Sequence, residues 1–199
     1  ITVSGSATVA QFNYLAGLND GVITATISEG DMSTLEGISE SGNALAITVT
    51  DSTVSAAELN TLNDKTTVPI TVNSTTITGT AADVITAYEA NEAGTITGLN
   101  NEAVILTDTT LSAANLLTID AYPYTTGVVN ASSVITITGS AADLITAYTA
   151  KEAGTITFST DEAITVNDSL TIAQFNYLAA NNDGVITATI SEGDMATLD

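Results

Sequence analysis

The sequence predicts an α/β fold, specifically a right-handed solenoid of 28–30-residue coils in which each coil runs strand, turn, helix, strand. Three observations predict it. Ile77–Thr97 matches Ile137–Thr157 at all but four positions, so the chain is built from repeats. Threonine alternates with isoleucine or valine in short runs, which is the period of a strand with one buried face. Between these runs, apolar residues three and four positions apart predict short amphipathic helices.

The segment Ile135–Thr157 shows one complete unit. Its alternating start, ITIT, predicts a strand, and a glycine then turns the chain. Ser140 precedes Asp143 by three residues, the spacing at which a hydroxyl caps the first amides of a helix. The apolar stripe that follows covers about three turns and ends at Gly154, a residue type that commonly terminates helices. Thr155–Thr157 predicts the return strand.

The same order is expected along the rest of the chain, with strands at Ile1–Ser4, Val22–Ile27, Ala46–Thr50, Ile70–Asn73, Val104–Thr107, Val128–Asn130 and Ile164–Val166. Helices are expected near Asp31 and at the capping pairs Thr8/Gln11, Ser55/Glu58 and Ser112/Asn115. Asn19-Asp20-Gly21 is expected to close the first helix, and Tyr122-Pro123-Tyr124 to break a later one. Strands that return to their sheet through a helix are parallel and right-handed in nearly all cases, which gives parallel ladders beside a row of helices.

A second, longer period covers the shorter one. Thr8–Leu35 recurs at Thr171–Leu198 with four differences, an offset of 163 residues that contains six coils. We therefore expect residues 1–199 to form a single continuous solenoid array, a window from a longer protein of tandem repeats.

The charge of the chain excludes two classes of partner. There are 23 acidic residues against Lys65 and Lys151 alone, and the net charge is −21. Phosphate binding depends on Lys and Arg, so nucleic acid and anionic membrane surfaces are excluded. No apolar run is long enough for membrane insertion. A saline or calcium-rich exterior, where charge repulsion is screened, suits the chain better than cytosol.

Catalytic chemistry has little support in the sequence. There is no Cys, His or Arg, which removes thiol and imidazole mechanisms, and neither lysine lies in a catalytic motif. Asp161 and Glu162 could form an acid–base pair, but acidic residues occur on every turn, and a solvated surface explains them better. We therefore expect that the protein is not an enzyme.

Metal binding is the stronger candidate for site chemistry. Only oxygen ligands are available, which indicates calcium. Acidic residues and asparagines gather at the predicted coil corners, and the expected calcium ligands are Asp20, Asp64, Asp161, Glu162 and Asp183. The alternative is that Asn and Asp beside glycine cap helices and form turns. The EF-hand loop and the glycine-aspartate nonapeptide of calcium β-rolls are missing, so the sequence leaves both interpretations open.

Paired threonines offer a second surface. They are expected to point outward and stack in rows, and the pairs are Thr24/Thr26, Thr48/Thr50, Thr76/Thr78, Thr95/Thr97, Thr136/Thr138, Thr155/Thr157 and Thr187/Thr189. Such rows resemble the ice-binding faces of β-solenoid antifreeze proteins. The alternative is that threonine, a strong strand former, simply covers the sheet. The loop Glu36–Asn43 and the Tyr122–Tyr124 break are further positions for a binding surface.

The recurring pattern, seen as ITITGSAADL from Ile135 and ITGTAADV from Ile77, resembles the tandem repeats of giant secreted bacterial surface proteins of the S-layer and adhesin type, as found in cyanobacteria and marine proteobacteria. The resemblance implies an extracellular structural role, export by a dedicated secretion system and dependence on calcium. We expect self-association into a rod, filament, sheath or surface layer. The alternative is an adhesin stalk or binding module that displays its threonine-rich or loop surface to ice, glycans or cells.

Overall fold

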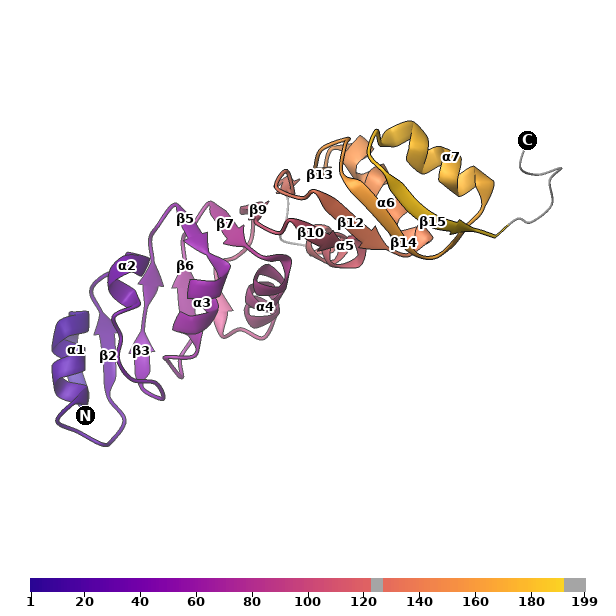
Figure 1. The fold of residues 1–199 in the computed structure, drawn as a ribbon. Coiled ribbons are helices and arrows are strands. Elements are labelled where there is room, and N and C mark those ends of the chain that lie inside the picture. Colours follow the sequence, from indigo (N-terminus) through magenta and orange to yellow (C-terminus); the bar gives the residue numbers. More distant parts are fainter. Residues whose placement is uncertain (123–126, 192–199) are drawn as a thin grey trace. The chain divides into compact units, whose positions relative to one another are not determined.

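The computed structural model describes residues 1–122 and 127–191, and the chain divides into two compact units. The first unit contains Ile1–Gly79 and Asp83–Glu102, and the second contains Thr80–Ala82 and Ala103–Asp199. Both are mixed α/β structures in which the strands pair in parallel (Figure 1). The predicted α/β class with parallel ladders is therefore confirmed, whereas the single continuous array stays a prediction.

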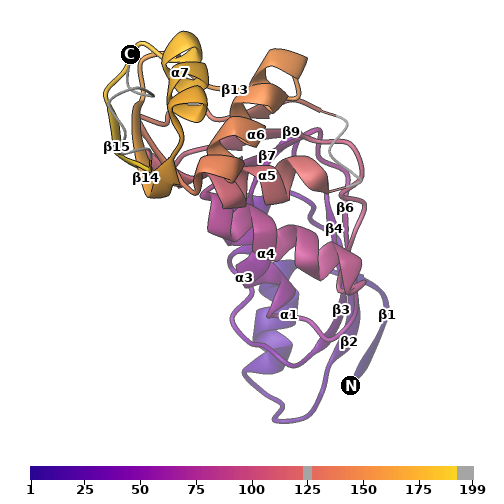
Figure 2. The ribbon, with the colours of Figure 1, turned by 90° about the vertical axis from the view of Figure 1, so that its right-hand side faces the viewer.

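In the first unit, parallel strands lie beside short helices. Its sheets have the orders β1-β2-β3 and β4-β6-β8, and β5 pairs with β7. Figure 2 shows α1 and α3 on one side and strands β1 to β3 on the other. The elements are β1 (Thr2–Ala7), α1 (Val9–Ala16), β2 (Thr24–Ile27), α2 (Met32–Leu35), β3 (Ala44–Ala46), β4 (Thr48–Val49), β5 (Thr53–Ser55), α3 (Ala56–Asn63), β6 (Ile70–Val72), β7 (Thr76–Gly79), most of α4 (Ala81–Glu92) and β8 (Ile96–Thr97).

The second unit has the same organisation. One sheet has the order β10-β12-β14-β15, and β11 pairs with both β9 and β13. Helices α5, α6 and α7 lie in sequence order, each beside the next. The elements are β9 (Ala103–Leu106), β10 (Thr110–Ser112), α5 (Ala113–Ala121), β11 (Val129–Asn130), β12 (Thr136–Gly139), α6 (Ala141–Ala153), β13 (Ile156–Thr157), β14 (Ala163–Leu170), α7 (Ile172–Asn181) and β15 (Ile186–Ile190).

The alternation of the sequence decides which side chains form the core. Leu45, Ile47 and Val49 are buried while Thr48 between them is exposed, as expected for a strand with one covered face. In α6 the buried residues are Ala141, Leu144, Ala147 and Tyr148, a stripe with spacings of three and four that faces the strands. The core is therefore a layer of strand side chains against one face of each helix.

Local capping signals place most helix starts correctly. Thr8 and Gln11 form the expected capping box, and the Ser140 hydroxyl accepts from the Asp143 amide at 3.1 Å. Gly154 ends α6 with φ 81°, the left-handed conformation that favours glycine. Two expectations are wrong: α1 ends at Ala16 with Gly17 as its C-cap, before Asn19-Asp20-Gly21, and the Ser112 side chain makes no capping hydrogen bond.

Carboxylates from one coil bind the first helical amide of the preceding coil in four places. Each bond lies within one unit, and each carboxylate lies at a helix N-terminus, where the aligned backbone dipoles favour negative charge. The bonds are Val9 N to Glu29 Oε2 (3.2 Å), Met32 N to Asp51 Oδ2 (2.8 Å), Ala81 N to Asp108 Oδ2 (2.8 Å) and Ala141 N to Asp168 Oδ1 (2.8 Å). We call these the inter-coil caps.

Helices α3 and α5 meet a glycine where α1, α2, α4 and α6 meet a carboxylate. A Cβ at Gly79 would lie 3.2 Å from the Cβ of Ala56, and a Cβ at Gly139 would lie 3.0 Å from that of Ala113. We call the residue that turns the chain between a strand and the next helix the turn residue. From Gly30 to Asp168 the turn residues are alternately glycine and aspartate along the sequence. A helix preceded by a glycine turn thus receives an inter-coil cap, and a helix preceded by an aspartate turn is met by glycine.

The 163-residue period is present in the hydrogen-bonding register as well as in the sequence. β1 pairs with β2 through Thr2↔Thr24, Ser6↔Thr26 and Ala7↔Ile27. β14 pairs with β15 through Thr165↔Thr187, Ser169↔Thr189 and Leu170↔Ile190. Every residue of the second set lies 163 positions after its counterpart, and both pairs have their irregularity at the same place.

Candidate functional site

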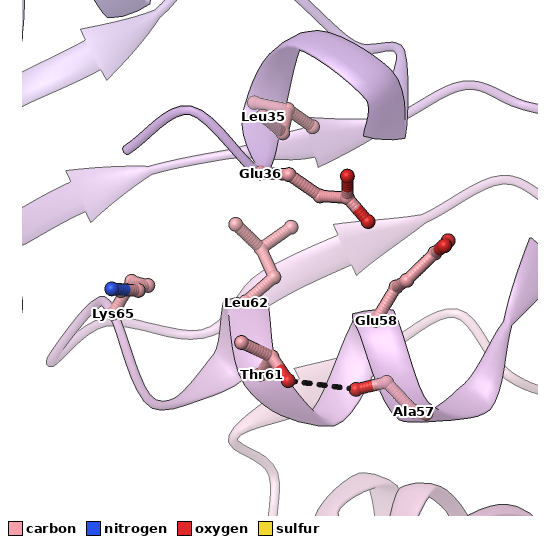
Figure 3. Close-up of a pocket in the computed structure, with 7 residues that line it drawn as sticks. All are labelled: Leu35, Glu36, Ala57, Glu58, Thr61, Leu62 and Lys65. Atoms are coloured by element: carbon pink, nitrogen blue, oxygen red, sulfur yellow. Dashed lines mark hydrogen bonds between the residues drawn. The ribbon is translucent and has the colours of Figure 1, made fainter. Parts of the chain in front are cut away.

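A groove between α2 and α3 in the first unit contains a glutamate, Glu58, whose pKa is raised by its surroundings. Its volume is about 300 Å³, and its walls include Leu35, Leu62 and three ionisable side chains, Glu36, Glu58 and Lys65. Figure 3 shows the two carboxylates pointing toward one another, with Lys65 beyond Leu62 and away from them.

The two glutamates interact unfavourably when both are charged. Burial, followed by the charge of Glu36 and a hydrogen bond with it, raises the pKa of Glu58, and the charge of Asp51 adds to this. Chemically, such a pair can share a proton or hold a cation between the carboxylates.

We expect Glu58→Gln to stabilise the protein at pH 7. A carboxyl group whose pKa is raised by folding stabilises the folded state below its ordinary pKa, 4.5 here, and that contribution is lost as the pH rises through the folded-state pKa. The variant removes the repulsion, so its urea midpoint should exceed that of the wild type at pH 7, and the difference should shrink toward pH 4. Glu40→Gln, at an exposed loop position, is the control. An equal or lower midpoint for Glu58→Gln at pH 7 would contradict this account.

A second ionisable cluster is buried in the second unit. Glu162 is 1% exposed, and its Oε1 accepts a short hydrogen bond from the hydroxyl of Tyr148 on α6. Its Oε2 is buried and has no hydrogen-bond partner among residues 1–122 and 127–191. The Lys151 ammonium lies 4.3 Å from the ring centroid of Phe158 and 5.4 Å from that of Tyr148. This cluster attaches the loop before β14 to the inner face of α6.

Burial is the main cause of the pKa shifts in this cluster. It raises the pKa of Tyr148, and the hydrogen bond and charge of Glu162 add to the effect, because each opposes a phenolate. Burial also lowers the pKa of Lys151, while the charge of Glu162 acts in the opposite direction. A neutral phenol that donates to a carboxyl group is therefore the stable arrangement, and it positions a loop without offering a reactive group to solvent.

The first unit contains a counterpart 60 residues earlier. Glu102 is 2% exposed, Tyr88 is fully buried, and burial with the nearby Glu102 charge raises the pKa of Tyr88. Asn91 takes the place of Lys151 and binds both the N–H and the carbonyl of Leu99. Sequence reasoning missed both tyrosine–glutamate pairs. The signal was the recurrence of tyrosine and glutamate 14 residues apart in two otherwise matching repeats.

The residues expected as calcium ligands are distributed over both units, and three of them, Asp161, Glu162 and Asp183, come from neighbouring loops. Asp20 follows α1 and is exposed, and Asp64 is the exposed C-cap residue of α3. Asp161 is exposed and accepts a short hydrogen bond from the Ser159 hydroxyl, whereas Glu162 belongs to the buried tyrosine pair. Asp183 is exposed, and its amide donates to Thr160, which brings it beside the Asp161 loop. Among the described residues, no three acidic side chains form a group that could hold a metal ion, and calcium at these positions stays a prediction.

The paired threonines are solvent-accessible, but they belong to several short ladders. Thr24 and Thr26 lie in the β1-β2-β3 sheet, where their partners in β3 are alanines. Thr97 pairs with Thr71 in the β4-β6-β8 sheet, and Thr138 pairs with Ser112 and Thr165 in another. The threonines cover the outer faces of the sheets, and the rows are interrupted within each unit.

Two segments that depart from the repeat pattern were expected as positions for a binding surface, and the structure describes the first more fully than the second. The loop Glu36–Asn43 is tied to α1, because Asn13 donates to the Gly37 carbonyl at 2.7 Å and accepts from Ser39 at 3.0 Å. Its residue Ile38 is buried. At the other departure, Tyr122 is the C-cap residue of α5, and Pro123 and Tyr124 lie outside the described residues.

Comparison with known proteins identifies no relative. No protein-family model, curated protein or solved structure matches this sequence significantly. Within the described residues, no helix combines the length and the apolar character that crossing a bilayer requires.

Proposed function

We propose that this chain is a segment of an extracellular structural protein without enzymatic activity, a rod, filament, sheath or surface layer built by stacking coils into a right-handed α/β solenoid. The observation that carries the proposal is the recurrence of one strand register, with its irregularity, after 163 residues. A structure that repeats both its sequence and its register can be extended without a new kind of contact.

The contacts between neighbouring coils support the same proposal. Parallel ladders join strands of neighbouring coils, such as β12 and β14, and the inter-coil caps join the start of a helix to the coil that follows it. Both kinds of contact are made between neighbours, which is the energetic organisation of a solenoid. Among the described residues, β1 pairs with β2 and β15 pairs with β14, so the strand pairing at both places is between neighbouring coils.

The proposed location and assembly follow from charge. A net charge of −21 opposes association at low ionic strength, and salt of several tenths molar reduces the screening length to roughly 4–5 Å. Association is therefore proposed for a saline exterior, with calcium bound by the corner carboxylates as a further source of neutralisation. Self-association is the proposed interaction.

Electron microscopy and X-ray scattering of the chain in 0.5 M salt, with calcium or with a chelator, test this function. We expect elongated assemblies whose axial repeat, set by six stacked coils at about 4.8 Å each, is roughly 29 Å. Loss of assemblies on chelation, and in a variant with Asp161→Asn and Asp183→Asn, would support calcium at that corner. Compact monomers at every concentration and salt level would rule out the structural proposal.

The exposed threonines favour a second candidate, an adhesin stalk or binding module. Thr187 and Thr189 on β15 are both exposed, as are Thr24 and Thr26 on β2. Binding of ice, glycans or cells by the monomeric chain, lost when these threonines are replaced by valine, would favour this candidate over assembly.

A further inference from the structure

We propose that the groove between α2 and α3 is a lateral contact between two copies of this chain, in which Lys65 of each copy enters the groove of the other and binds Glu36 and Glu58. The inference deepens the proposed function, on which it rests, because it names a surface for self-association. The groove lies between consecutive coils of the first unit, with α1 earlier and α4 later in the chain.

The groove exists because α2 is short. At 1.5 Å of rise per residue, the four residues of α2 extend about 6 Å and the eight residues of α3 about 12 Å. Beyond Glu36 the chain turns toward α1, where Asn13 holds the loop at Gly37 and Ser39. Helix α2 therefore covers only part of the facing side of α3, and a space of about 300 Å³ opens there.

The two ends of the groove carry opposite charges. Glu36 and Glu58 point toward one another at one end, and Lys65 lies beyond Leu62 at the other (Figure 3). The charges that act on the pKa of Glu58 are those of Glu36 and Asp51, both negative, so Lys65 of the same copy does not neutralise the pair. A cation supplied by another molecule would relieve the repulsion between the two carboxylates.

The spacing along α3 makes this surface complementary to itself. Glu58 and Lys65 are seven residues apart, which is about two helical turns, so they lie on one face about 10 Å apart along the helix axis. Two such faces related by a two-fold axis near Thr61 run antiparallel. Each lysine then lies opposite the glutamates of the other copy, and the same contact is made twice.

The middle of the face permits a close approach. Ala57 and Thr61 are small and exposed, and the Thr61 hydroxyl donates to the Ala57 carbonyl at 2.9 Å, so it keeps a hydrogen bond when water is excluded. The aliphatic stem of an incoming lysine can lie along Leu35 and Leu62 while its ammonium group binds the carboxylates.

The distribution of positive charge favours a second copy as the occupant. The chain has two lysines and no arginine. The Lys151 ammonium is held within its own unit, where it donates to the Ser159 carbonyl and lies 4.3 Å from the ring centroid of Phe158. Lys65 is therefore the lysine placed to join chains. A purely basic segment of another protein would match the carboxylates but would meet Lys65 with like charge.

Sedimentation velocity over a concentration series tests the contact in 0.15 M salt, where the screening length is about 8 Å and repulsion between distant charges is weakened. The wild-type chain should dimerise. Glu58→Lys and Lys65→Glu should each weaken dimerisation at least ten-fold, because each places like charges opposite one another. Glu89→Lys, at an exposed position on α4, changes the net charge as Glu58→Lys does and should not weaken dimerisation.

Mixing the two variants separates a specific contact from a general effect of charge. An equal mixture of Glu58→Lys and Lys65→Glu chains should dimerise within about three-fold of the wild type, because every lysine at positions 58 and 65 then faces a glutamate of the other chain. Circular dichroism verifies that each variant is folded. A wild-type chain that stays monomeric, folded variants that dimerise like the wild type, or a mixture that forms no dimers would each overturn the proposal.

The outcomes also distinguish this surface from the proposed function. If elongated assemblies form while Glu58→Lys and Lys65→Glu leave association unchanged, the surface is wrong and the structural function stands. If the variants and their mixture behave as expected but elongated assemblies do not form, the structural function is wrong and the surface stands. Tight binding of a lysine-rich peptide by a chain that does not dimerise would assign the groove to a basic partner instead and overturn the proposal.

Discussion

Tyr148→Phe is expected to destabilise the second unit by about 2–3 kcal/mol, because it removes the hydroxyl that donates to a buried carboxyl group. The other oxygen of Glu162 already has no hydrogen-bond partner among the described residues. After the substitution both oxygens would be buried without a donor from the helix, and desolvation would no longer be offset. Urea unfolding followed by circular dichroism measures the loss.

Tyr14→Phe is the matched control, since Tyr14 is 69% exposed and its change should stay within about 0.5 kcal/mol. A double-mutant cycle with Glu162→Gln isolates the coupling between the two side chains. If Tyr148→Phe leaves the unfolding midpoint within error of the wild type, the tyrosine–glutamate pair does not hold the loop before β14.

Gly98→Ala is expected to cost about 3 kcal/mol or more, or to prevent folding of the first unit. Gly98 has φ 97°, and a Cβ there would lie 2.2 Å from the carbonyl oxygen of Val72 on the neighbouring strand. The substitution therefore combines left-handed backbone strain with a collision against main chain that is part of a sheet. Thermal and urea unfolding measure the effect.

Gly94→Ala separates the two causes. Gly94 has φ 75°, but a Cβ at this position would meet no other atom within 4 Å, so strain alone applies and the expected cost is about 1 kcal/mol. Equal losses for the two variants would show that the close approach to Val72 contributes nothing.

The sequence predicts the features of this fold that depend on near neighbours in the chain. Alternating threonine identifies the strands because burial of one face follows from the period of two, as in Thr48–Val49. The Thr8/Gln11 and Ser140/Asp143 caps are predicted because donor and acceptor are three residues apart. The end of α1 was missed because Gly17 and Asn19-Asp20-Gly21 are both acceptable stops by local chemistry.

Contacts between coils could not be predicted in this way. Asp108 has the appearance of a turn residue, and only the folded arrangement places its carboxylate on the amide of Ala81, 27 positions away. Gly98 illustrates the same limit, since the matching position in the next repeat is Phe158 and the repeat alone does not reveal the close approach. The groove at Glu36 and Glu58 likewise depends on two helices meeting.

The alternation of glycine and aspartate turns has a consequence for how such a protein can change length. Removing one coil between Gly30 and Asp168 would bring together two turns of the same type. Two glycine turns in succession would leave a helix start without its carboxylate, and two aspartate turns in succession would place a carboxylate against a tightly packed alanine. The α1 coil, where two glycine turns are consecutive, has Glu29 beside Gly30 to supply the missing charge. Duplication and deletion should therefore proceed in pairs of coils, and a designer who wishes to lengthen the chain should insert an even number.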